Sequence, residues 1–398
     1  MTHRARILAA LRGQPVDRLP WVPRLDLWYN AHRHRGTLPA EWAGASLAQI
    51  VTDLGVGLHA VIPDFLATEG PDEVYDRALG IEHVPNQPFR VRFRRTQRIV
   101  YREGDQTRVV YRTPAGELTA RLVYSEQMRR DGITIMHVTE RVVKSDDDYR
   151  RVAALFADLE VERDETRYAA LRDEVGELGV AVAFGSGAAS PGHHLLRDLV
   201  PYDRFYYDLH DHPEWIAETA ASMAGYYEQV LEACAASSAE VVLHGANYDV
   251  MLTPPRLFEA HILHGLAHWA KGLHAASKLL ATHADGENDG LCALLRQSGV
   301  DVADAICPAP MTRLSLRDYR EQLGPQVATW GGICSSSLLP PLFTDAQFEA
   351  HLDDVLSAVG DGRRLILSVA DTTPPEASLA RLRRIGERAA ECRLGDPP

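Results

Sequence analysis

Residues 277–289 read S-K-L-L-A-T-H-A-D-G-E-N-D. The short apolar run ahead of His283 is typical of a buried strand. Gly286 and Gly290 allow a sharp turn after it, and ligand-capable side chains crowd positions 283–289: His283, Asp285, Glu287, Asn288 and Asp289. A strand that ends in an imidazole, carboxylates and glycines indicates a site in an α/β protein. The alternative is a turn followed by a helix cap at Asn288 or Asp289.

Strand-loop-helix units of this kind recur along the 398 residues. Buried strands are expected near eight positions, each followed by a polar loop and a helix: Trp21, Val61, Val182, Val242, Leu280, Ala305, Ala328 and Ile366. Regular alternation of short buried strands with helices favours a parallel sheet. Eight units over this length favour a closed (β/α)8 TIM barrel, so residues 1–398 are expected to form a single barrel domain.

The pattern changes between residues 81 and 139. Short runs rich in Val, Arg and Tyr alternate there with turn signals such as Glu103-Gly104-Asp105. The strands expected are 89–93, 97–102, 107–112, 118–124 and 134–138. This pattern predicts an antiparallel β insertion within the barrel. Because the segment has few catalytic residue types, we expect it to act as a lid or a scaffold.

Composition excludes several classes of function. The net charge of −13 argues against nucleic acid as the main partner, because phosphate binding needs a basic surface. No apolar run reaches the roughly 18–20 residues that span a bilayer, and the N-terminus shows no signal-peptide pattern. Five scattered cysteines without a C-x-x-C pair fit a reducing compartment. A cytoplasmic protein with no nucleic-acid or membrane partner is therefore expected.

Polar residues fall at the carboxyl ends of the expected strands, where the site of such a barrel lies. Near the first strand end, Trp28 and Tyr29 lie beside Arg24 and Asp26, a grouping that can hold an anionic small molecule by stacking and bidentate hydrogen bonds. The alternative for this group is a surface helix with solvated basic residues. The residues expected to bind substrate are Arg24, Asp26, Trp28, Tyr29, Asp64, His193, Asn247 and Cys307.

Four stretches carry a resemblance to a known family. Residues 15–20 read P-V-D-R-L-P, 113–116 read T-P-A-G, 283–288 read H-A-D-G-E-N and 371–375 read D-T-T-P-P. They resemble, in turn, the entry motif of the uroporphyrinogen decarboxylase superfamily, a hairpin of its methyltransferase branch, the H-x-C-G-N motif of that branch, and the last strand end of the family. The resemblance covers nearly the whole chain.

The resemblance implies two branches of chemistry. One branch decarboxylates a tetrapyrrole without a cofactor and uses an R-Q-A-G-R motif after the first strand, whereas this chain has a single arginine there, Arg24. The other moves methyl groups between a corrinoid and an acceptor, with zinc held by His, Cys and a late Cys. In that comparison His283 matches, Asp285 replaces the middle Cys, and the late Cys falls at Ala370 beside Asp371.

The chemistry of the site then has two interpretations. Zinc accepts carboxylate as well as imidazole, so His283, Asp285 and Asp371 form the expected metal set, harder than one with thiolate and suited to oxygen-bearing substrates or a different metal. Glu287 is a fourth ligand or a general base, and a thiol such as that of Cys307 could complete the set. Without a metal, acid–base groups would instead surround an organic anion; they are His283, Asp285 and Asp249, with Arg24 as the clamp.

Three functions follow. A metal-assisted methyl- or alkyl-group transferase acting on a small molecule is the first hypothesis, with Asp285, Glu287 and Asp249 as its catalytic residues. A cofactor-free decarboxylase or related lyase on a small carboxylic acid is the alternative. The third hypothesis is a barrel that binds a ligand or a partner protein without turnover. The chain has no D-x-H-x-x-G motif, so a corrinoid would arrive on a separate partner protein. A homodimer is the assembly expected.

Overall fold

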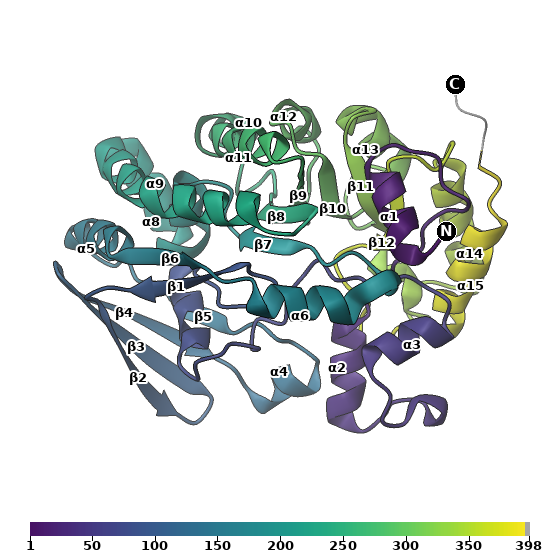
Figure 1. Ribbon diagram of the computed structural model, residues 1–398, viewed down its shortest axis with the longest axis horizontal. Coiled ribbons are helices and arrows are strands. Elements are labelled where there is room, and N and C mark those ends of the chain that lie inside the picture. Colours follow the sequence, from purple (N-terminus) through teal and green to yellow (C-terminus); the bar gives the residue numbers. More distant parts are fainter. Residues whose placement is uncertain (395–398) are drawn as a thin grey trace.

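A six-stranded parallel sheet forms the centre of the molecule. The computed structural model describes residues 1–394, and its parallel strands follow one another in chain order across the sheet (Figure 1). They are β7 (Ala183–Ser186), β8 (Val241–Ala246), β9 (Leu279–His283), β10 (Val302–Ile306), β11 (Ala328–Ile333) and β12 (Leu365–Val369). The α/β class and the alternation of buried strands with helices are thereby confirmed.

Two extended segments connect the outer strands of this sheet. Next to β12, the amide of Val22 donates to the carbonyl of Leu367 at 2.9 Å; at the other side, the amide of Val182 donates to Ala60 at 3.0 Å. The two segments also contact each other, because Gly57 donates to Trp21 at 2.9 Å. Strands were expected near Trp21 and Val61, but only isolated bridges form there. Prolines 20, 23 and 63 lack the amide hydrogens that a longer ladder needs.

One hydrophobic cluster takes side chains from every strand of the parallel sheet. Its members include Phe184, Leu243, Ala281, Val302, Trp330 and Ile366, together with Val22 and Val61 from the two extended segments. Helix α1 (His3–Leu11) adds Ile7 and Leu11 to the same cluster. The inward-facing side chains of all these segments therefore share one core, and their carboxyl ends lie on the same side of it.

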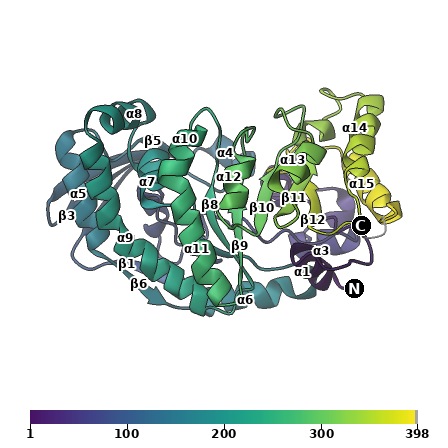
Figure 2. The ribbon, with the colours of Figure 1, turned by 90° about the horizontal axis from the view of Figure 1, so that it is seen from above.

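Helices pack around this sheet and follow its strands (Figure 2). The longest helix follows β7, and a helix that contains a π-helical turn follows β8. The longer ones are α2 (Asp26–Arg35), α3 (Leu47–Asp53), α5 (Asp146–Ala157), α6 (Thr166–Val175), α8 (Tyr202–Asp211), α9 (Pro213–Ala236), α11 (His264–Ala275), α13 (Leu316–Leu323), α14 (Asp345–Ser357) and α15 (Leu379–Glu391). Short helical segments are α4 (Glu126–Arg130), α7 (Pro191–His194), α10 (Pro255–Phe258) and α12 (Cys292–Gln297).

An antiparallel sheet lies at one end of the molecule, at the left of Figure 1. It contains β2 (Gln97–Glu103), β3 (Gln106–Thr113), β4 (Gly116–Val123) and β5 (His137–Glu140) in that order. The first three were expected within a residue or two, whereas β5 begins three residues later than predicted. Strand β1 (Phe89–Phe93) pairs outside this sheet with β6 (Leu159–Arg163), a strand that the sequence analysis missed. Tertiary pairing decides such short, polar strands.

Glycine at position 245, near the end of β8, leaves space for a buried tyrosine. Its φ is +80°, and a Cβ there would lie 2.0 Å from the hydroxyl of Tyr248. We expect Gly245→Ala to lower the free energy of unfolding by about 3 kcal/mol, through overpacking and backbone strain. Gly225→Ala is the control, because Gly225 lies in α9 and a Cβ there would meet no atom of another part of residues 1–394 within 4 Å, and alanine should stabilise that helix by roughly 0.5–1 kcal/mol. Urea unfolding followed by circular dichroism measures both; equal midpoints would contradict the prediction.

Within residues 1–394, none of the helices combines the length and the apolar character that crossing a bilayer requires.

Candidate metal centre

One histidine and two aspartates from distant strand ends come together. His283 is the last residue of β9, Asp285 lies two residues beyond it, and Asp371 follows β12. One ligand atom from each residue lies within 4.8 Å of the other two. Strands β10 and β11 separate β9 from β12 in the sheet, so only the curvature of the sheet brings these ends together. We call these three residues the metal cluster.

Asp304, in the middle of β10, holds the imidazole of His283. The two residues lie opposite each other in the β9–β10 register, and Nδ1 of His283 is 2.8 Å from Oδ2 of Asp304. The other ring nitrogen, Nε2, is 3.3 Å from Oδ1 of Asp371. Asp304 is 1% exposed, and its Oδ1 lies 3.7 Å from Nε2 of His59. The hydrogen bond between Nδ1 of His283 and Asp304 fixes the imidazole so that its Nε2 faces the metal cluster.

The carboxylates around His283 hold the ring in its charged form. Burial alone would lower the pKa of His283, but Asp304 and Asp371 raise it to about 10. Burial opposes ionisation of Asp304, yet His283 and His59 keep its pKa well below the usual range. The pKa of Asp371 is lowered to about 2, against burial, by His283 and Arg24. An imidazolium therefore lies between two ionised carboxylates.

Asp285 differs from the other two aspartates. Burial, and then the charge of Asp371, raise the pKa of its carboxyl group, and the opposing effects of His283 and Arg24 are smaller. A carboxyl group with a raised pKa holds a proton more readily than its neighbours. Asp285 is therefore the acid of the cluster that is best suited to give or take a proton.

Arg24 orients Asp371 from the opposite side. Its Nη1 donates to Oδ1 of Asp371 at 2.7 Å, and its Nε donates to Oδ1 of Asp26 at 3.0 Å. Burial would lower the pKa of Arg24, but Asp26 and Asp371 raise it. The backbone of Asp371 has a φ of 52°, which is uncommon for a residue with a Cβ and is often found at functional sites. Arg24 and Asp26, both predicted site residues, thus lie beside the cluster.

The donor set fits a divalent metal ion. Catalytic zinc sites use three protein ligands drawn from imidazole nitrogen and carboxylate oxygen, and leave a further position open. Metal-binding histidines usually give their second ring nitrogen to a carboxylate, as Nδ1 of His283 does with Asp304. Nε2 is therefore the atom left for a metal, and binding would release the proton that it holds. With two carboxylates and no thiolate, the set is hard and favours oxygen-bearing substrates.

A large cavity reaches the cluster. Its volume is about 1260 Å³, and Asp285 lines it together with three other predicted residues, His193, Asn247 and Asp249. His193 is buried, stacks on the ring of Tyr248, and has a pKa lowered to about 3 by burial, so its ring is neutral. Asn247 is exposed directly after β8, and its backbone N–H donates to the carbonyl of His283 at 2.9 Å.

Two of the predicted catalytic carboxylates hold loops together. The oxygens of Asp249 accept the amides of Met251 at 2.8 Å and Glu287 at 3.1 Å. Those of Glu287 accept the amides of Asp289 and Arg313, each at 3.0 Å. Neither side chain belongs to the metal cluster found among the described residues. The structure therefore brings together His283, Asp285 and Asp371, and uses Asp249 and Glu287 to position the loop that carries Asp285.

Three other predicted residues make their contacts outside the metal cluster, whereas a fourth, Cys307, lies close enough to feel the charge of Asp285. Trp28 is 1% exposed and packs edge-on against Trp42, because α2 turns this ring toward the core. The hydroxyl of Tyr29 donates to the carbonyl of Ala45 at 3.2 Å. Asp64 is exposed and accepts the amide of the residue two positions on. Cys307 is buried, and burial followed by the charge of Asp285 raises its pKa to about 12, which leaves a neutral thiol.

Residues 288 and 289 were weighed as helix caps, and this interpretation is wrong. Helix α12 begins at Cys292, and its N-cap Leu291 makes no side-chain cap bond. Asn288 is instead fully buried, and its Nδ2 donates to the carbonyl of Tyr248 at 2.6 Å. The amide thus joins the loops after β8 and β9.

Sequence reasoning missed Asp304 and His59. The available signal for Asp304 was a carboxylate in the middle of the apolar run V-A-D-A-I at 302–306, since a charge is rarely buried in a strand without a partner. His59 lies in an extended segment, and its ring packs edge-on against Trp330 with centroids 5.5 Å apart. No local pattern marks it, because its role depends on β10 and β11 lying beside it.

The raised pKa of His283 makes stability depend on pH. In metal-free protein, the folded-state pKa of about 10 exceeds the unfolded value of 6.5. The stabilisation is therefore complete below pH 6.5 and is lost as the pH rises toward 10, with a slope of at most about 1.4 kcal/mol per pH unit. Urea unfolding in EDTA at several pH values measures this slope. His283→Gln should remove it; an unchanged slope in that variant would assign the pH dependence to other groups.

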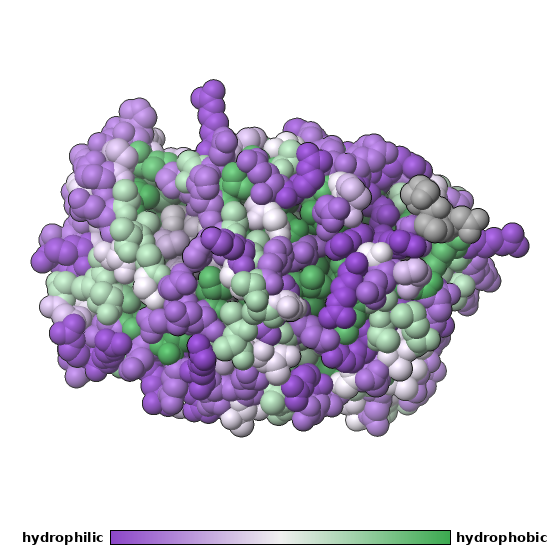
Figure 3. Space-filling view, turned by 45° about the horizontal axis from the view of Figure 1, so that its top comes forward, coloured by the Kyte–Doolittle hydropathy of each residue, from purple (hydrophilic) through white to green (hydrophobic). Residues whose placement is uncertain are grey.

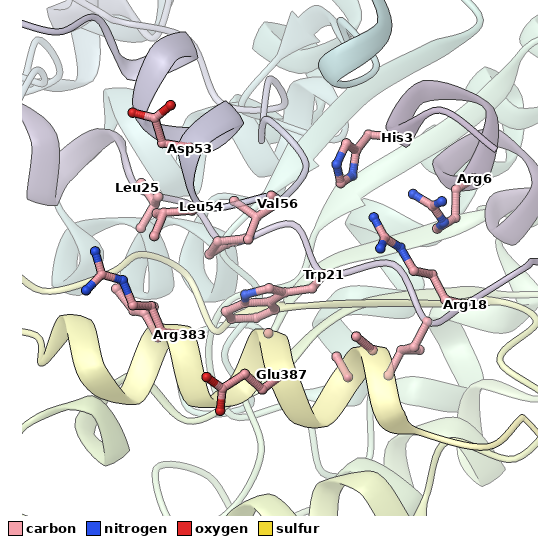
Figure 4. Close-up of a pocket in the computed structure, with 17 residues that line it drawn as sticks. His3, Arg6, Arg18, Trp21, Leu25, Asp53, Leu54, Val56, Arg383 and Glu387 are labelled. Atoms are coloured by element: carbon pink, nitrogen blue, oxygen red, sulfur yellow. The ribbon is translucent and has the colours of Figure 1, made fainter. Parts of the chain in front are cut away.

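A smaller cavity of about 350 Å³ lies elsewhere, among α1, α3 and α15. Figure 4 shows Trp21 at its centre, with Arg18 and Arg383 to either side. Its lining contains no member of the metal cluster. Of these two cavities, the larger one reaches the metal cluster, through Asp285.

Comparison with known proteins supports the fold. Neither the protein-family models nor the curated proteins include a match to this sequence. Among solved structures, the chain matches a methyltransferase from Methanosarcina mazei with a TM-score of 0.56 and 16% sequence identity. The match covers 98% of this chain and 99% of that chain. The chain therefore shares the fold of that methyltransferase over its whole length.

Proposed function

We propose that the protein is a metal-assisted methyl- or alkyl-group transferase that acts on a small molecule. The observation that carries this proposal is the cluster of His283, Asp285 and Asp371, in which Asp304 takes Nδ1 of the imidazole and leaves Nε2 for a metal. The full-length likeness in fold to a methyltransferase supports it. Zinc is the metal proposed, because three protein ligands with an open position are typical of catalytic zinc.

The proposal includes a closed (β/α)8 barrel of the uroporphyrinogen decarboxylase superfamily, closer to its methyltransferase-like branch. Three hydrogen bonds support closure of the barrel. They join residue 22 with β12, residue 57 with residue 21, and residue 182 with residue 60. The shared inner cluster of the six strands and both extended segments supports it too. In such a barrel the site lies at the carboxyl ends of the strands, where the metal cluster is found.

Each residue of the site has a proposed part. A bound zinc would supply Lewis acidity toward an oxygen-bearing acceptor. His283 and Asp371 hold its place, Asp304 and Arg24 orient them, and Asp285 is either the third ligand or the group that exchanges a proton with the acceptor. A corrinoid, where one takes part, arrives on a separate partner protein. A cytoplasmic location and a homodimeric assembly belong to the same proposal.

A cofactor-free decarboxylase or related lyase is the second candidate. It is favoured by Asp285, whose raised pKa suits it to protonate the carbanion that loss of carbon dioxide leaves. Arg24, whose Nη1 donates to Asp371 at 2.7 Å, is the proposed clamp for the substrate carboxylate. This reaction requires no metal.

Metal analysis separates the two candidates. The purified protein is dialysed against EDTA and titrated with zinc chloride by calorimetry. The transferase proposal predicts one zinc per chain and a methyl-transfer activity that EDTA removes and zinc restores. A metal-free protein that retains a decarboxylase activity would establish the lyase instead. Loss of every activity in Asp285→Ala, with the fold retained, would exclude a protein that only binds its ligand.

A further inference from the structure

The cavity that reaches Asp285 is built from two parts of the fold. The antiparallel region supplies half-buried apolar side chains from β4, α4, β5 and the loop between them; these are Val123, Met128, Ile133, Ile135, Met136 and Val138. The parallel region supplies Leu196, Leu252 and residues of the loops that follow β8 and β9. At about 1260 Å³, the cavity exceeds the roughly 300–1,000 Å³ of most small-molecule sites. It therefore has room for a ligand longer than one that fills the metal cluster alone.

Three arginines that line this cavity surround one buried aspartate. Nη1 of Arg197 donates to Asp198 at 2.7 Å, and Nη1 of Arg77 donates to the other oxygen at 3.4 Å. Arg141 donates to three carbonyls, those of Leu196 at 2.9 Å, Arg197 at 2.6 Å and Val200. Burial opposes ionisation, but Arg197 and Arg77 keep the pKa of Asp198 well below its usual range. We call Arg77, Arg141 and Arg197 the arginine trio.

The trio carries more positive charge than its partners neutralise. Besides Asp198, its carboxylate partner within 4.0 Å in the described chain is Glu82, which lies 2.9 Å from Arg77. Three guanidinium groups thus face two carboxylates. Within residues 1–394, Arg141 is not paired with a carboxylate. Its guanidinium lies 4.2 Å from the ring centroid of Tyr202.

The other acids of the cavity are already engaged. Glu140 pairs with Arg121 at 2.9 Å and with Lys144, and Asp249 accepts two backbone amides. Asp285 belongs to the metal cluster. The excess charge of the trio is therefore available to a ligand, and an anion is the ligand that it favours.

Arg197 has unused donors that reach open space. In residues 1–394 its side chain makes one hydrogen bond, to Asp198, and its other nitrogens are not among the sealed, unpaired polar atoms. Gly187 makes room for this guanidinium, because a Cβ there would lie 2.6 Å from Nη1 and 2.9 Å from Nη2. A planar guanidinium with free donors matches the paired oxygens of a carboxylate or phosphate.

We propose that the cavity binds an elongated organic acid. Its acid group pairs with Arg197 and Arg141, its apolar body lies along the wall formed by residues 133–138, and its far end reaches Asp285. Two large hydrophobic side chains at the cavity, Leu252 and Tyr202, are 38% and 41% exposed, although much of the molecular surface in Figure 3 is hydrophilic. The proposal deepens the proposed function and rests on it only for the reacting end at Asp285.

Calorimetry with three eight-carbon probes tests this site: octanoate, octyl phosphate and octylammonium, each with metal-free and zinc-loaded protein. We expect at least one of the two anions to bind at least tenfold more tightly than octylammonium, and the better anion tells carboxylate from phosphate. Arg197→Gln should weaken that anion at least tenfold and leave octylammonium unchanged. Arg92→Gln is the matched control, because Arg92 is 60% exposed and pairs with Glu162 on the surface.

Equal binding of octylammonium, no anion binding at millimolar concentration, or full anion affinity in Arg197→Gln would overturn the proposal. Arg197→Gln also removes the contact with Asp198. Two further variants therefore test the site if that variant does not fold. Gly187→Ala displaces the guanidinium without removing it, and Leu252→Glu places a negative charge at a half-exposed position; each should weaken the anion at least fivefold. Zinc binding without anion binding would overturn this site alone, and anion binding without zinc would overturn the metal-assisted function alone.

Discussion

Replacing His283 with alanine is expected to lower the affinity for zinc by more than about 100-fold and to abolish metal-dependent turnover. Loss of only an outer partner of a metal ligand typically costs roughly 10- to 100-fold, and here a ligand itself is removed. The variant also leaves Asp304 and Asp371 without the charge that lies 2.8 Å and 3.3 Å from them. Breaking a buried ion pair in this way costs about 3–5 kcal/mol, so the metal-free variant should also unfold at lower urea concentration.

The measurements are a zinc titration by calorimetry and urea unfolding of the metal-free protein. His268→Ala is the control, because His268 pairs with Glu228 on the surface, where both side chains are more than half exposed. Such a pair contributes about 0–1 kcal/mol, and its loss should leave zinc affinity unchanged. Zinc affinity within twofold of the unmodified protein in His283→Ala would remove His283 from the metal site and with it the proposed transferase chemistry.

Asp304→Asn should have the second-largest effect, although Asp304 is not itself a proposed ligand. The amide keeps the shape of the side chain but removes the charge that holds Nδ1 of His283, so the pKa of His283 should fall. We expect the free energy of unfolding of the metal-free protein to drop by about 3 kcal/mol and zinc affinity to drop by roughly 10- to 100-fold. The shift in the His283 titration, followed by NMR, would show that Asp304 acts through this ring.

Asp301→Asn is the matched control for this second variant. Asp301 directly precedes the same strand and also pairs with a histidine, His274 at 2.8 Å, but the histidine side chain is 45% exposed. Screening by solvent makes the expected loss there no more than about 1 kcal/mol, with no change in zinc affinity. Similar losses in both variants would mean that the buried position of Asp304 has no special part in holding His283.

Much of the fold could be predicted because its signals are local. Short apolar runs such as Leu279–Leu280 and 365–369, each followed by a turn and an amphipathic helix, predict a buried parallel strand by their length and flanks. The structure confirms six of these strands in chain order. The errors fall on short or proline-broken segments, such as those near Trp21 and Leu159, where hydrogen-bond partners from elsewhere in the chain decide whether a strand forms.

The metal cluster was predictable for a related reason. His283 and Asp285 lie in one crowded turn, and the family resemblance added Asp371, which follows another strand. The rule that strand ends meet on one side of a parallel sheet agrees with this grouping. The same rule predicted that Trp28 binds substrate, but α2 turns this side chain into the core. It also gave no role to Asp304, which lies inside a strand rather than at its end.

The α/β class, six of the eight expected parallel strands, and the pair His283 and Asp285 could be predicted from the sequence, because periodicity and strand-end chemistry lie in neighbouring residues, and the family resemblance added Asp371. Tertiary structure alone decided that Asp304 and His59 share one buried charge network with His283. It alone placed the arginine trio, Arg77, Arg141 and Arg197, around one cavity with Asp285. These groupings join residues far apart in the chain, and no local pattern encodes the distances between them.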